Sequence, residues 1–162
     1  MNHDDETQVL LGSPAGSDAA GRELPLGAHL ITARRGYFHH GIYVGGNRVV
    51  HYAGFCAAWH RGPVEETTLD RFSGGREVSM RAHVRAKYSG EEAMRRARSR
   101  LGEENYRLLT NNCEHFCSWC VSGESRSEQV EACLHHPWTS IPLIASLLRT
   151  IFAALGPSLR EA

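Results

Sequence analysis

The run from Asn112 to Phe116 contains a cysteine, Cys113, that could act as a nucleophile. The residues that follow predict a helix from about Cys113 to Val121, ended by Gly123. Cys113 would then occupy the helix N-terminus, where unpaired backbone N–H groups and the helix dipole favour negative charge. Such a position lowers the pKa of a thiol and populates the nucleophilic thiolate. The same N–H groups can bind an oxyanion that forms beside the sulfur.

A free cysteine can also be a purely structural core residue, so catalysis at Cys113 depends on a nearby base. Histidines in a predicted β-hairpin are the candidates. The hairpin joins strands at His39–Val44 and Arg48–Tyr52 through the loop Gly45-Gly46-Asn47, whose residues accept positive φ. A loop of this length pairs Val44 with Arg48 and thereby sets the register of both strands.

In that register His39 and His51 are diagonal neighbours on one face of the hairpin, about 7–8 Å apart. A thiolate over that face would meet one imidazole while the other orients it, as in a catalytic triad. A two-residue loop would instead place the two rings on opposite faces. His40 points to the other face of its strand, where we expect a solvent-facing or edge histidine.

The hairpin and the cysteine motif together resemble the lecithin:retinol acyltransferase (LRAT) family, within the permuted NlpC-type, papain-like cysteine hydrolase superfamily. The family pattern is a histidine, three residues, a tyrosine, a second histidine twelve positions after the first, and later Asn-Cys-Glu-His-Phe. Tyr43 selects His39 as the first histidine of this pattern, and His51 is the second. The likeness extends from about Leu24 to Gly123.

The resemblance implies a mechanism. Cys113 would attack an acyl carbonyl, His39 would act as general base and then as general acid, and His51 would orient the His39 ring. An acyl-thioester on Cys113 would form from an ester- or amide-linked substrate, with phospholipids among the candidates, and would pass to water, an alcohol or an amine. The alternative is a non-catalytic module of the same family that binds an acyl chain or a peptide in the same cleft.

The elements that must position these residues form an α+β domain. We expect a small antiparallel sheet packed against two or three helices, in the permuted papain-like arrangement. Besides the hairpin, the sequence predicts a strand over 26–32, mixed extended and turn structure over 59–68, a helical turn over 68–72 and a strand over 77–84. A helix capped by Ser89, with Glu92 completing a capping box, would end at Gly102.

We expect three regions along the chain: a flexible leader at 1–22, the LRAT-like catalytic domain at 23–125 and a C-terminal helical extension at 126–162. The apolar stretch from Ile141 to Leu155 is shorter than the roughly 20 residues that span a bilayer, and it contains Arg149. It fits an amphipathic helix that packs on the domain or makes weak contact with a membrane.

Composition limits the function classes. The 162 residues are 41% hydrophobic and 22% charged, which is typical of one soluble domain. Lys plus Arg and Asp plus Glu number 18 each, so no net charge attracts nucleic acid, and we expect no nucleic-acid partner. The acidic start, Met1 to Glu6, does not fit a signal peptide, and clustered cysteines do not fit a disulfide framework. We therefore expect a cytoplasmic protein, with peripheral membrane contact as an option.

Metal binding is the main competing interpretation of the cysteines. Cys113, Cys117 and Cys120 have the spacing of an iron–sulfur motif, and His115 could join them at a zinc site. Helical spacing offers a simpler account, because positions 113, 116, 117 and 120 form one buried stripe while 115 faces elsewhere. We expect no metal and no cofactor. His115 would pack or cap locally, and Glu65-Glu66 would be solvated surface charge.

Overall fold

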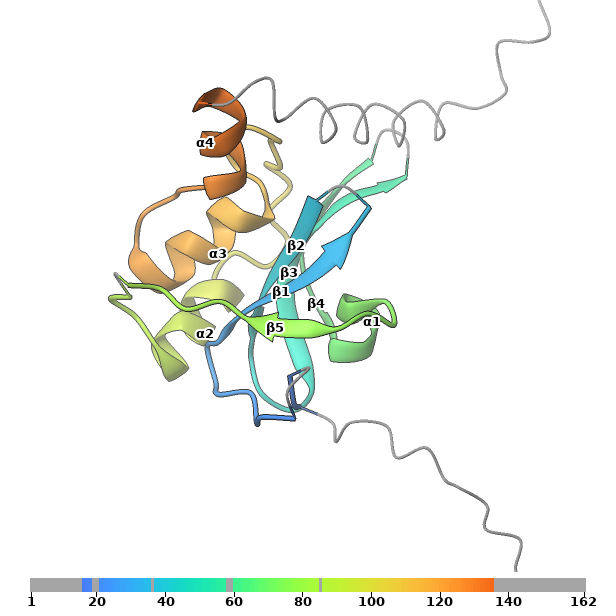
Figure 1. The fold of residues 1–162 in the computed structure, drawn as a ribbon, viewed down its shortest axis with the longest axis vertical. Coiled ribbons are helices and arrows are strands. Elements are labelled where there is room, and N and C mark those ends of the chain that lie inside the picture. Colours follow the sequence, from blue (N-terminus) through green and yellow to red (C-terminus); the bar gives the residue numbers. More distant parts are fainter. Residues whose placement is uncertain (1–15, 19–20, 36, 58–59, 85, 136–162) are drawn as a thin grey trace, which may run out of the picture.

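The computed structural model describes residues 16–18, 21–35, 37–57, 60–84 and 86–135 (Figure 1). At its centre is an antiparallel sheet of five strands in the order β4-β3-β2-β1-β5. The strands are β1 (His29–Arg34), β2 (Tyr37–Tyr43), β3 (Arg48–Ala57), β4 (His60–Thr68) and β5 (Val78–Met80). Helices pack on both faces of the sheet, so the predicted α+β class is confirmed.

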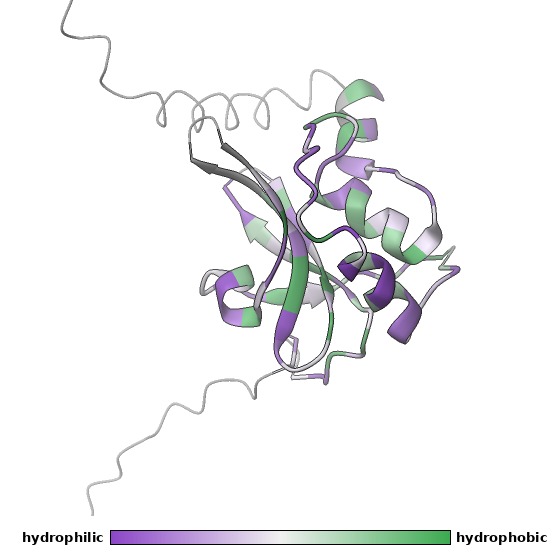
Figure 2. Ribbon diagram, turned by 180° about the vertical axis from the view of Figure 1, so that it is seen from behind, coloured by the Kyte–Doolittle hydropathy of each residue, from purple (hydrophilic) through white to green (hydrophobic). Residues whose placement is uncertain are grey.

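The helices are α1 (Leu69–Ser73), α2 (Gly90–Arg98), α3 (Cys113–Ser122) and α4 (Glu128–His135). On one face of the sheet α3 packs against β2 and β3, and α2 packs against α3. The short α1 packs on the opposite face. Hydrophilic residues dominate α2 while hydrophobic residues are frequent on α3 (Figure 2), which agrees with α3 being the more enclosed helix of this layer.

Two apolar cores lie on the two sides of the sheet. The first contains Ile42 and Val50 from the strands together with Phe116 from α3. The second contains Tyr43 from β2 together with Phe72 from α1. Because side chains alternate along a strand, successive residues of β2 enter different cores. This alternation determines which histidine meets which helix.

Strands β4 and β5 differ from the sequence prediction. The prediction of mixed extended and turn structure over 59–68 is wrong, because β4 is a continuous strand paired along β3. Pro63 is compatible with this strand because β4 lies at the edge of the sheet. The strand predicted over 77–84 is reduced to β5, since its ladder with β1 covers only Leu30 to Thr32.

Three local boundaries also differ. β1 begins later than predicted, since Gly27 has a φ of 75°, outside the extended region. Ser89 is the N-cap of α2, but its side chain makes no capping hydrogen bond, so the predicted capping box with Glu92 does not form. α2 ends before Gly102, whose N–H bonds to the Val64 carbonyl at 2.8 Å and so leaves the helical path.

The two ends of the chain are only partly described. Within the predicted leader, Asp18 is buried and its carboxylate accepts a hydrogen bond from Arg22 Nε at 2.8 Å. The stretch from Ile141 to Leu155 lies outside the described residues, so its predicted helix and membrane contact stay predictions. No helix in the described part of the chain has the length and apolar character needed to cross a bilayer.

Candidate active site

The β2–β3 hairpin has the three-residue loop that the sequence predicts. The Val44 N–H donates to the Arg48 carbonyl at 2.9 Å, and the ladder continues for two further pairs. The loop Gly45-Gly46-Asn47 has φ angles of 82°, 56° and 59°. The predicted register is therefore confirmed, and with it the face on which each histidine lies.

His39 and His51, the histidine pair, lie together on the α1 face of the sheet. His39 Nε2 and His51 Nδ1 are 3.0 Å apart, and the rings meet edge to face with their centroids 4.9 Å apart. Both rings are buried against Phe72, with centroid distances of 5.2 Å and 5.7 Å. Gly41 permits this packing, because a Cβ there would lie 2.8 Å from Phe72 Cε2. The structure thus brings together the two imidazoles that the sequence paired.

Cys113 is the first residue of α3, as predicted. The Asn112 side chain caps this helix by accepting hydrogen bonds from the Glu114 and His115 N–H groups, each at 3.0 Å. The Cys113 residue is only 5% exposed. Burial raises the pKa of its thiol to about 11, and the backbone N–H groups of His40 and Glu114 offset this only in part. The predicted lowering of the thiol pKa is wrong, because desolvation outweighs the effect of the helix N-terminus.

The thiol and the histidine pair are associated with different faces of the sheet. Cys113 packs in the core that contains Ile42, whereas the pair contacts Phe72 on the α1 side. Among the described residues, no hydrogen bond joins the Cys113 sulfur to a histidine ring. The contact that a thiol–imidazole reaction needs is therefore not formed in this conformation.

The thiol nevertheless lies close to the strands that carry the pair. The β2–β3 ladder ends at Ile42–Val50, although both strands continue. The Val44 N–H points towards β3 and the Tyr43 N–H towards β1, and these directions alternate along a strand. The His40 N–H therefore points to the β3 side, where the ladder has ended, and this group reaches the Cys113 sulfur. Cys113 thus lies where the two strands part.

His40 is part of a second histidine group that the sequence did not reveal. Its Nδ1 lies 2.8 Å from His29 Nε2, and His29 Nδ1 lies 2.6 Å from His83 Nε2. These three residues form the histidine chain. His40 is 1% exposed and its Nε2 lies 2.9 Å from Gln129 Nε2. The expectation of a solvent-facing or edge histidine is wrong, because α3 packs on β2 and α4 supplies Gln129 at this position.

The Gln129 amide determines the direction of hydrogen bonding in the histidine chain. Its Oε1 accepts from the Phe38 N–H at 3.1 Å, and its Nε2 donates to Glu114 Oε2 at 3.1 Å. The amide nitrogen therefore also donates to His40 Nε2, which must be the unprotonated nitrogen of that ring. The His40 proton then lies on Nδ1 and is donated along the chain. Since both ring nitrogens of His40 are used, this residue is not free to act as a base for the thiol.

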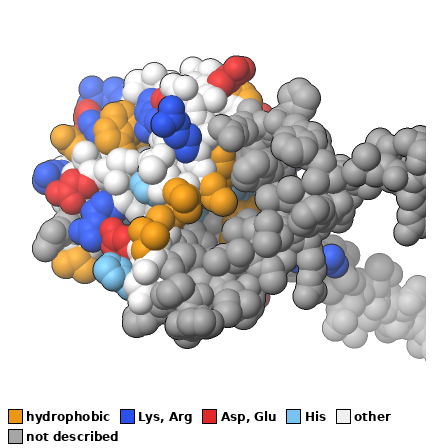
Figure 3. Space-filling view, turned by 90° about the horizontal axis from the view of Figure 1, so that it is seen from above, with side chains coloured by type: hydrophobic (Ala, Val, Ile, Leu, Met, Phe, Trp, Pro, Cys, Tyr) orange, Lys and Arg blue, Asp and Glu red, His pale blue; other side chains and the backbone are white. Residues whose placement is uncertain are grey.

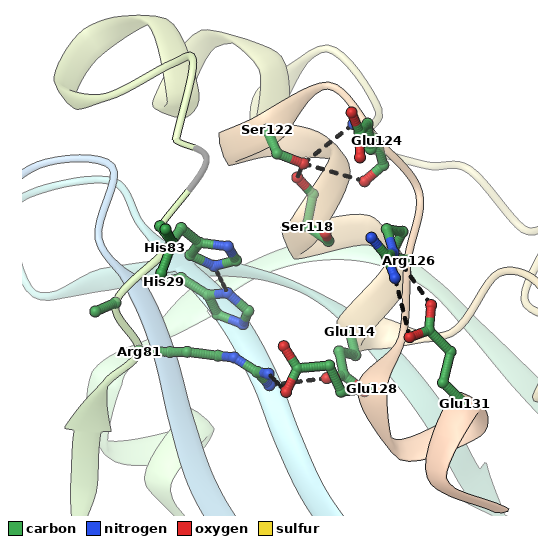
Figure 4. Close-up of a pocket in the computed structure, with 12 residues that line it drawn as sticks. His29, Arg81, His83, Glu114, Ser118, Ser122, Glu124, Arg126, Glu128 and Glu131 are labelled. Atoms are coloured by element: carbon green, nitrogen blue, oxygen red, sulfur yellow. Dashed lines mark hydrogen bonds and ion pairs between the residues drawn. The ribbon is translucent and has the colours of Figure 1, made fainter. Parts of the chain in front are cut away.

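The carboxylate of Glu114 lies beside the histidine chain and is 2% exposed. It accepts from Arg81 at 2.8 Å and from Ser127 Oγ at 2.5 Å. Burial raises the pKa of Glu114, but the hydrogen bond from Ser127, the charge interaction with His40 and the hydrogen bonds from Gln129 together hold this pKa below its usual value. A cavity of about 430 Å³ opens next to this group and is walled by charged side chains and the outer end of the histidine chain (Figure 4). Cys113 and the histidine pair do not line this cavity.

Cys117 and Cys120 are fully buried in the same core as Cys113 and Phe116, which confirms the predicted apolar stripe of α3. All three thiols are free. His115 Nδ1 bonds to the side-chain oxygen of the N-cap residue at 2.9 Å, so this histidine caps locally, as predicted. Within the ranges that the structure describes, no three His, Cys, Asp or Glu side chains converge as metal ligands would.

Glu65 lies near the histidine pair, and the sequence interpretation missed it. Glu66 ion-pairs with Arg48 at 2.6 Å and with Arg98 at 3.0 Å on the α2 side of the sheet. Glu65 points to the other face, where its Oε1 lies 3.4 Å from His51 Nε2. The available signal was strand alternation, which separates two adjacent glutamates onto opposite faces.

Apolar side chains are exposed on the end of the molecule where α4 lies (Figure 3). The large apolar residues that the described chain exposes include Phe38, Leu109 and Leu134, at 50%, 60% and 71%. Phe38 is joined to α4 through its N–H bond to Gln129.

Comparison with known proteins gives a consistent result. The family model described as lecithin retinol acyltransferase matches residues 22–126. Mouse lecithin retinol acyltransferase is 29% identical over 130 residues, which is 63% of this chain and 56% of that protein. Human phospholipase A and acyltransferase 2 is 30% identical over 139 residues, or 76% of this chain and 83% of that protein. The chain spans little more than half the length of the mouse and rat lecithin retinol acyltransferases.

Proposed function

Because this chain belongs to the lecithin retinol acyltransferase family, we propose that it is a cysteine-dependent acyltransferase or hydrolase. Cys113 takes an acyl group from an ester- or amide-linked substrate as a thioester and passes it to water, an alcohol or an amine. The names of two relatives, a lecithin retinol acyltransferase and a phospholipase A and acyltransferase, favour a lipid acyl group as the substrate class. The observation that carries the proposal is the hydrogen-bonded histidine pair on the strands beside the thiol.

The resting groups are neutral in this proposal. Burial lowers the pKa of His39 well below its ordinary value and raises the pKa of Cys113 to about 11. The reaction therefore proceeds by general-base catalysis and not from a preformed thiolate. His39 accepts the thiol proton as the sulfur attacks the acyl carbonyl carbon. The thiol–imidazole contact forms in the substrate complex, since catalytic hydrogen bonds are often loose in a free enzyme.

The remaining steps return each group to its starting state. The carbonyl oxygen becomes an oxyanion, which the backbone N–H of Cys113 can stabilise. The next two N–H groups of α3 are occupied by the side chain of Asn112. The oxyanion collapses, the bond to the leaving oxygen or nitrogen breaks, and His39 gives its proton to that leaving group. The acceptor then attacks the thioester, with His39 as base again, and the thiol of Cys113 leaves with the proton.

A specific observation also supports the non-catalytic alternative. The Cys113 residue is 5% exposed and its thiol pKa is raised, as for many structural cysteines. In that case the domain binds an acyl chain or a peptide without turning it over. The exposed apolar side chains such as Phe38 and Leu134 are compatible with either function.

Mass spectrometry of the intact full-length protein distinguishes the two functions. We expect incubation with phosphatidylcholine vesicles, acyl amides and acyl esters to add one acyl group to Cys113 with at least one donor. The adduct should be absent in Cys113→Ala and present in Cys117→Ala, the matched core cysteine. Binding of acyl ligand without an adduct, unchanged in Cys113→Ser, would favour the non-catalytic module.

Membrane contact is a separate part of the proposal and depends on residues outside the described ranges. We propose weak contact of a cytoplasmic protein with lipid through Ile141 to Leu155. Co-sedimentation with liposomes should be stronger for the full chain than for a chain that ends before Ile141. Equal sedimentation would exclude this role for the segment.

A further inference from the structure

A buried nitrogen of the histidine pair is unsatisfied within the described part of the chain. His51 Nε2 is buried, and among the described residues it makes no hydrogen bond. The charged group beside this nitrogen is Glu65, whose Oε1 lies 3.4 Å away. Glu65 stands directly opposite His51 in the β3–β4 register, so the backbone of the sheet holds the carboxylate at this position. Unsatisfied buried polar atoms are rare and often mark functional sites.

The protonation of His51 decides whether its partner can act as a base. His39 Nε2 is used in the contact with His51 Nδ1, so only His39 Nδ1 is left to accept a thiol proton. His51 Nδ1 also lies 3.0 Å from the Tyr52 carbonyl oxygen. If Nδ1 of His51 carries the proton, it donates to both neighbours, and His39 must be protonated at Nδ1. That arrangement leaves His39 without a lone pair for the thiol.

The opposite tautomer gives a competent base. If the His51 proton is on Nε2, then His51 Nδ1 accepts from the His39 Nε2–H, and His39 Nδ1 keeps its lone pair. The carbonyl of Tyr52 favours the first tautomer, whereas a carboxylate at His51 Nε2 favours the second. Hydrogen bonds to an ionised acceptor are roughly twice as strong as neutral ones.

We propose that Glu65 is a positioning residue that draws the His51 proton to Nε2 and thereby keeps His39 Nδ1 free to act as the base. The inference rests on the proposed function of Cys113 and His39. The Glu65 side chain is 46% exposed, so it has room to rotate towards His51 Nε2 from its present distance of 3.4 Å. When His39 holds the thiol proton, the same carboxylate also stabilises the positive charge on the pair.

The other charged groups around the pair have the opposite effect to Glu65 on the pKa of His51. Burial lowers the pKa of His51; the Tyr52 carbonyl and Glu65 raise it, while Arg34 from β1 and Arg71 from α1 lower it. Phe72 covers both rings and supplies no charge. Glu65 is thus the acidic group that balances two arginines at this site. Its loss should lower the pKa of the pair further.

The test combines nitrogen NMR with activity, using Glu65→Gln and the exposed-site control Glu104→Gln. In ¹⁵N-histidine-labelled full-length protein, two-bond correlations to the ring protons identify the protonated nitrogen of His51. We expect Nε2 in the unmodified protein, in Glu104→Gln and in Glu65→Asp, and Nδ1 in Glu65→Gln. Acylation of Cys113 should fall by about ten- to a hundredfold in Glu65→Gln, within the usual size of a general-base effect. The acidic limb of kcat/KM should move to lower pH, which a purely structural defect would not cause.

The outcomes separate this inference from the proposed function. An active enzyme whose Glu65→Gln variant keeps the His51 proton on Nε2 and keeps its pH profile overturns the role of Glu65 and leaves the function intact. A protein that is never acylated at Cys113 overturns the function. In that case, movement of the His51 proton from Nε2 to Nδ1 in Glu65→Gln would still support the proposed effect of Glu65 on the His51 tautomer. An unchanged tautomer would overturn that effect as well.

Discussion

Two groups of histidines occupy opposite faces of β2 and differ in how completely they are bonded. In the histidine chain, both nitrogens of His29 and both nitrogens of His40 have partners between 2.6 and 2.9 Å. In the histidine pair, His51 Nε2 is buried and makes no hydrogen bond to any residue that the structure describes. Buried polar atoms are normally satisfied. The fully bonded chain stabilises the packing of α3 and α4 on the sheet. The incompletely bonded pair is the group to which the proposed function assigns proton exchange.

Removal of the proposed nucleophile should have the largest effect. Cys113→Ala should lower acyl transfer by about a thousandfold or more, since the nucleophile carries the covalent step. Product formation from an acyl ester, measured by mass spectrometry, checks this. Cys117→Ala removes a thiol from the same core and should stay active after correction for folded fraction. Retained turnover in Cys113→Ala would show that Cys113 is not the nucleophile and that the histidine pair activates a different group.

Substituting one histidine of each group tests whether the pair is catalytic and the chain is structural. His39→Ala should lower kcat by about a hundredfold, because it removes the general base. His40→Ala should lower the free energy of unfolding by about 2 kcal/mol, because the buried His29 Nε2 and the Gln129 amide lose their partner. Its turnover per folded molecule should stay near the unmodified value. Chemical denaturation and kinetics on the same samples measure both quantities, and a reversed pattern would exchange the roles of the two groups.

Acid should destabilise the protein through the histidine chain. Burial lowers the pKa of His40 from its ordinary 6.5 to about 4. Between these values the unfolded chain binds a proton that the folded chain does not, so stability should fall as the pH decreases from about 6.5 to about 4. Melting temperatures measured across this range should fall less in His40→Gln, which does not titrate. The exposed-site variant His135→Gln should follow the unmodified protein.

The smallest expected effect concerns the resting thiol. A thiol with a pKa of about 11 is almost entirely protonated at pH 7, so Cys113 should react slowly with iodoacetamide there. Its alkylation rate should rise steadily as the pH approaches 11, as followed by peptide mapping. A plateau already near pH 7 would indicate a preformed thiolate and a mechanism different from general-base catalysis.

The sequence predicts the local geometry of the site well. The loop Gly45-Gly46-Asn47 determines the hairpin register by its length and φ preferences, and this is enough to pair His39 with His51. The helix that starts at Cys113 was predicted from the residues after it, and the structure adds Asn112 as its N-cap. Each of these features depends on residues close together along the chain.

Features that depend on distant residues were not predictable in the same way. His40 is buried by partners 11 and 89 positions away, and no pattern near His40 indicates either of them. The raised thiol pKa of Cys113 results from packing of α3 against the sheet, which a helix-terminus argument does not include. The different environments of Glu65 and Glu66 depend on the register of β4 against β3, which pairs Glu65 with His51.

The Gln129 side chain links the position of α4 to the tautomer of the His40 ring. A single amide holds the Phe38 N–H, the Glu114 carboxylate and the His40 ring at once. Without this amide, the unprotonated Nε2 of His40 would lose its hydrogen-bond donor inside the protein. The packing of one short helix therefore determines which nitrogen of a buried histidine carries the proton.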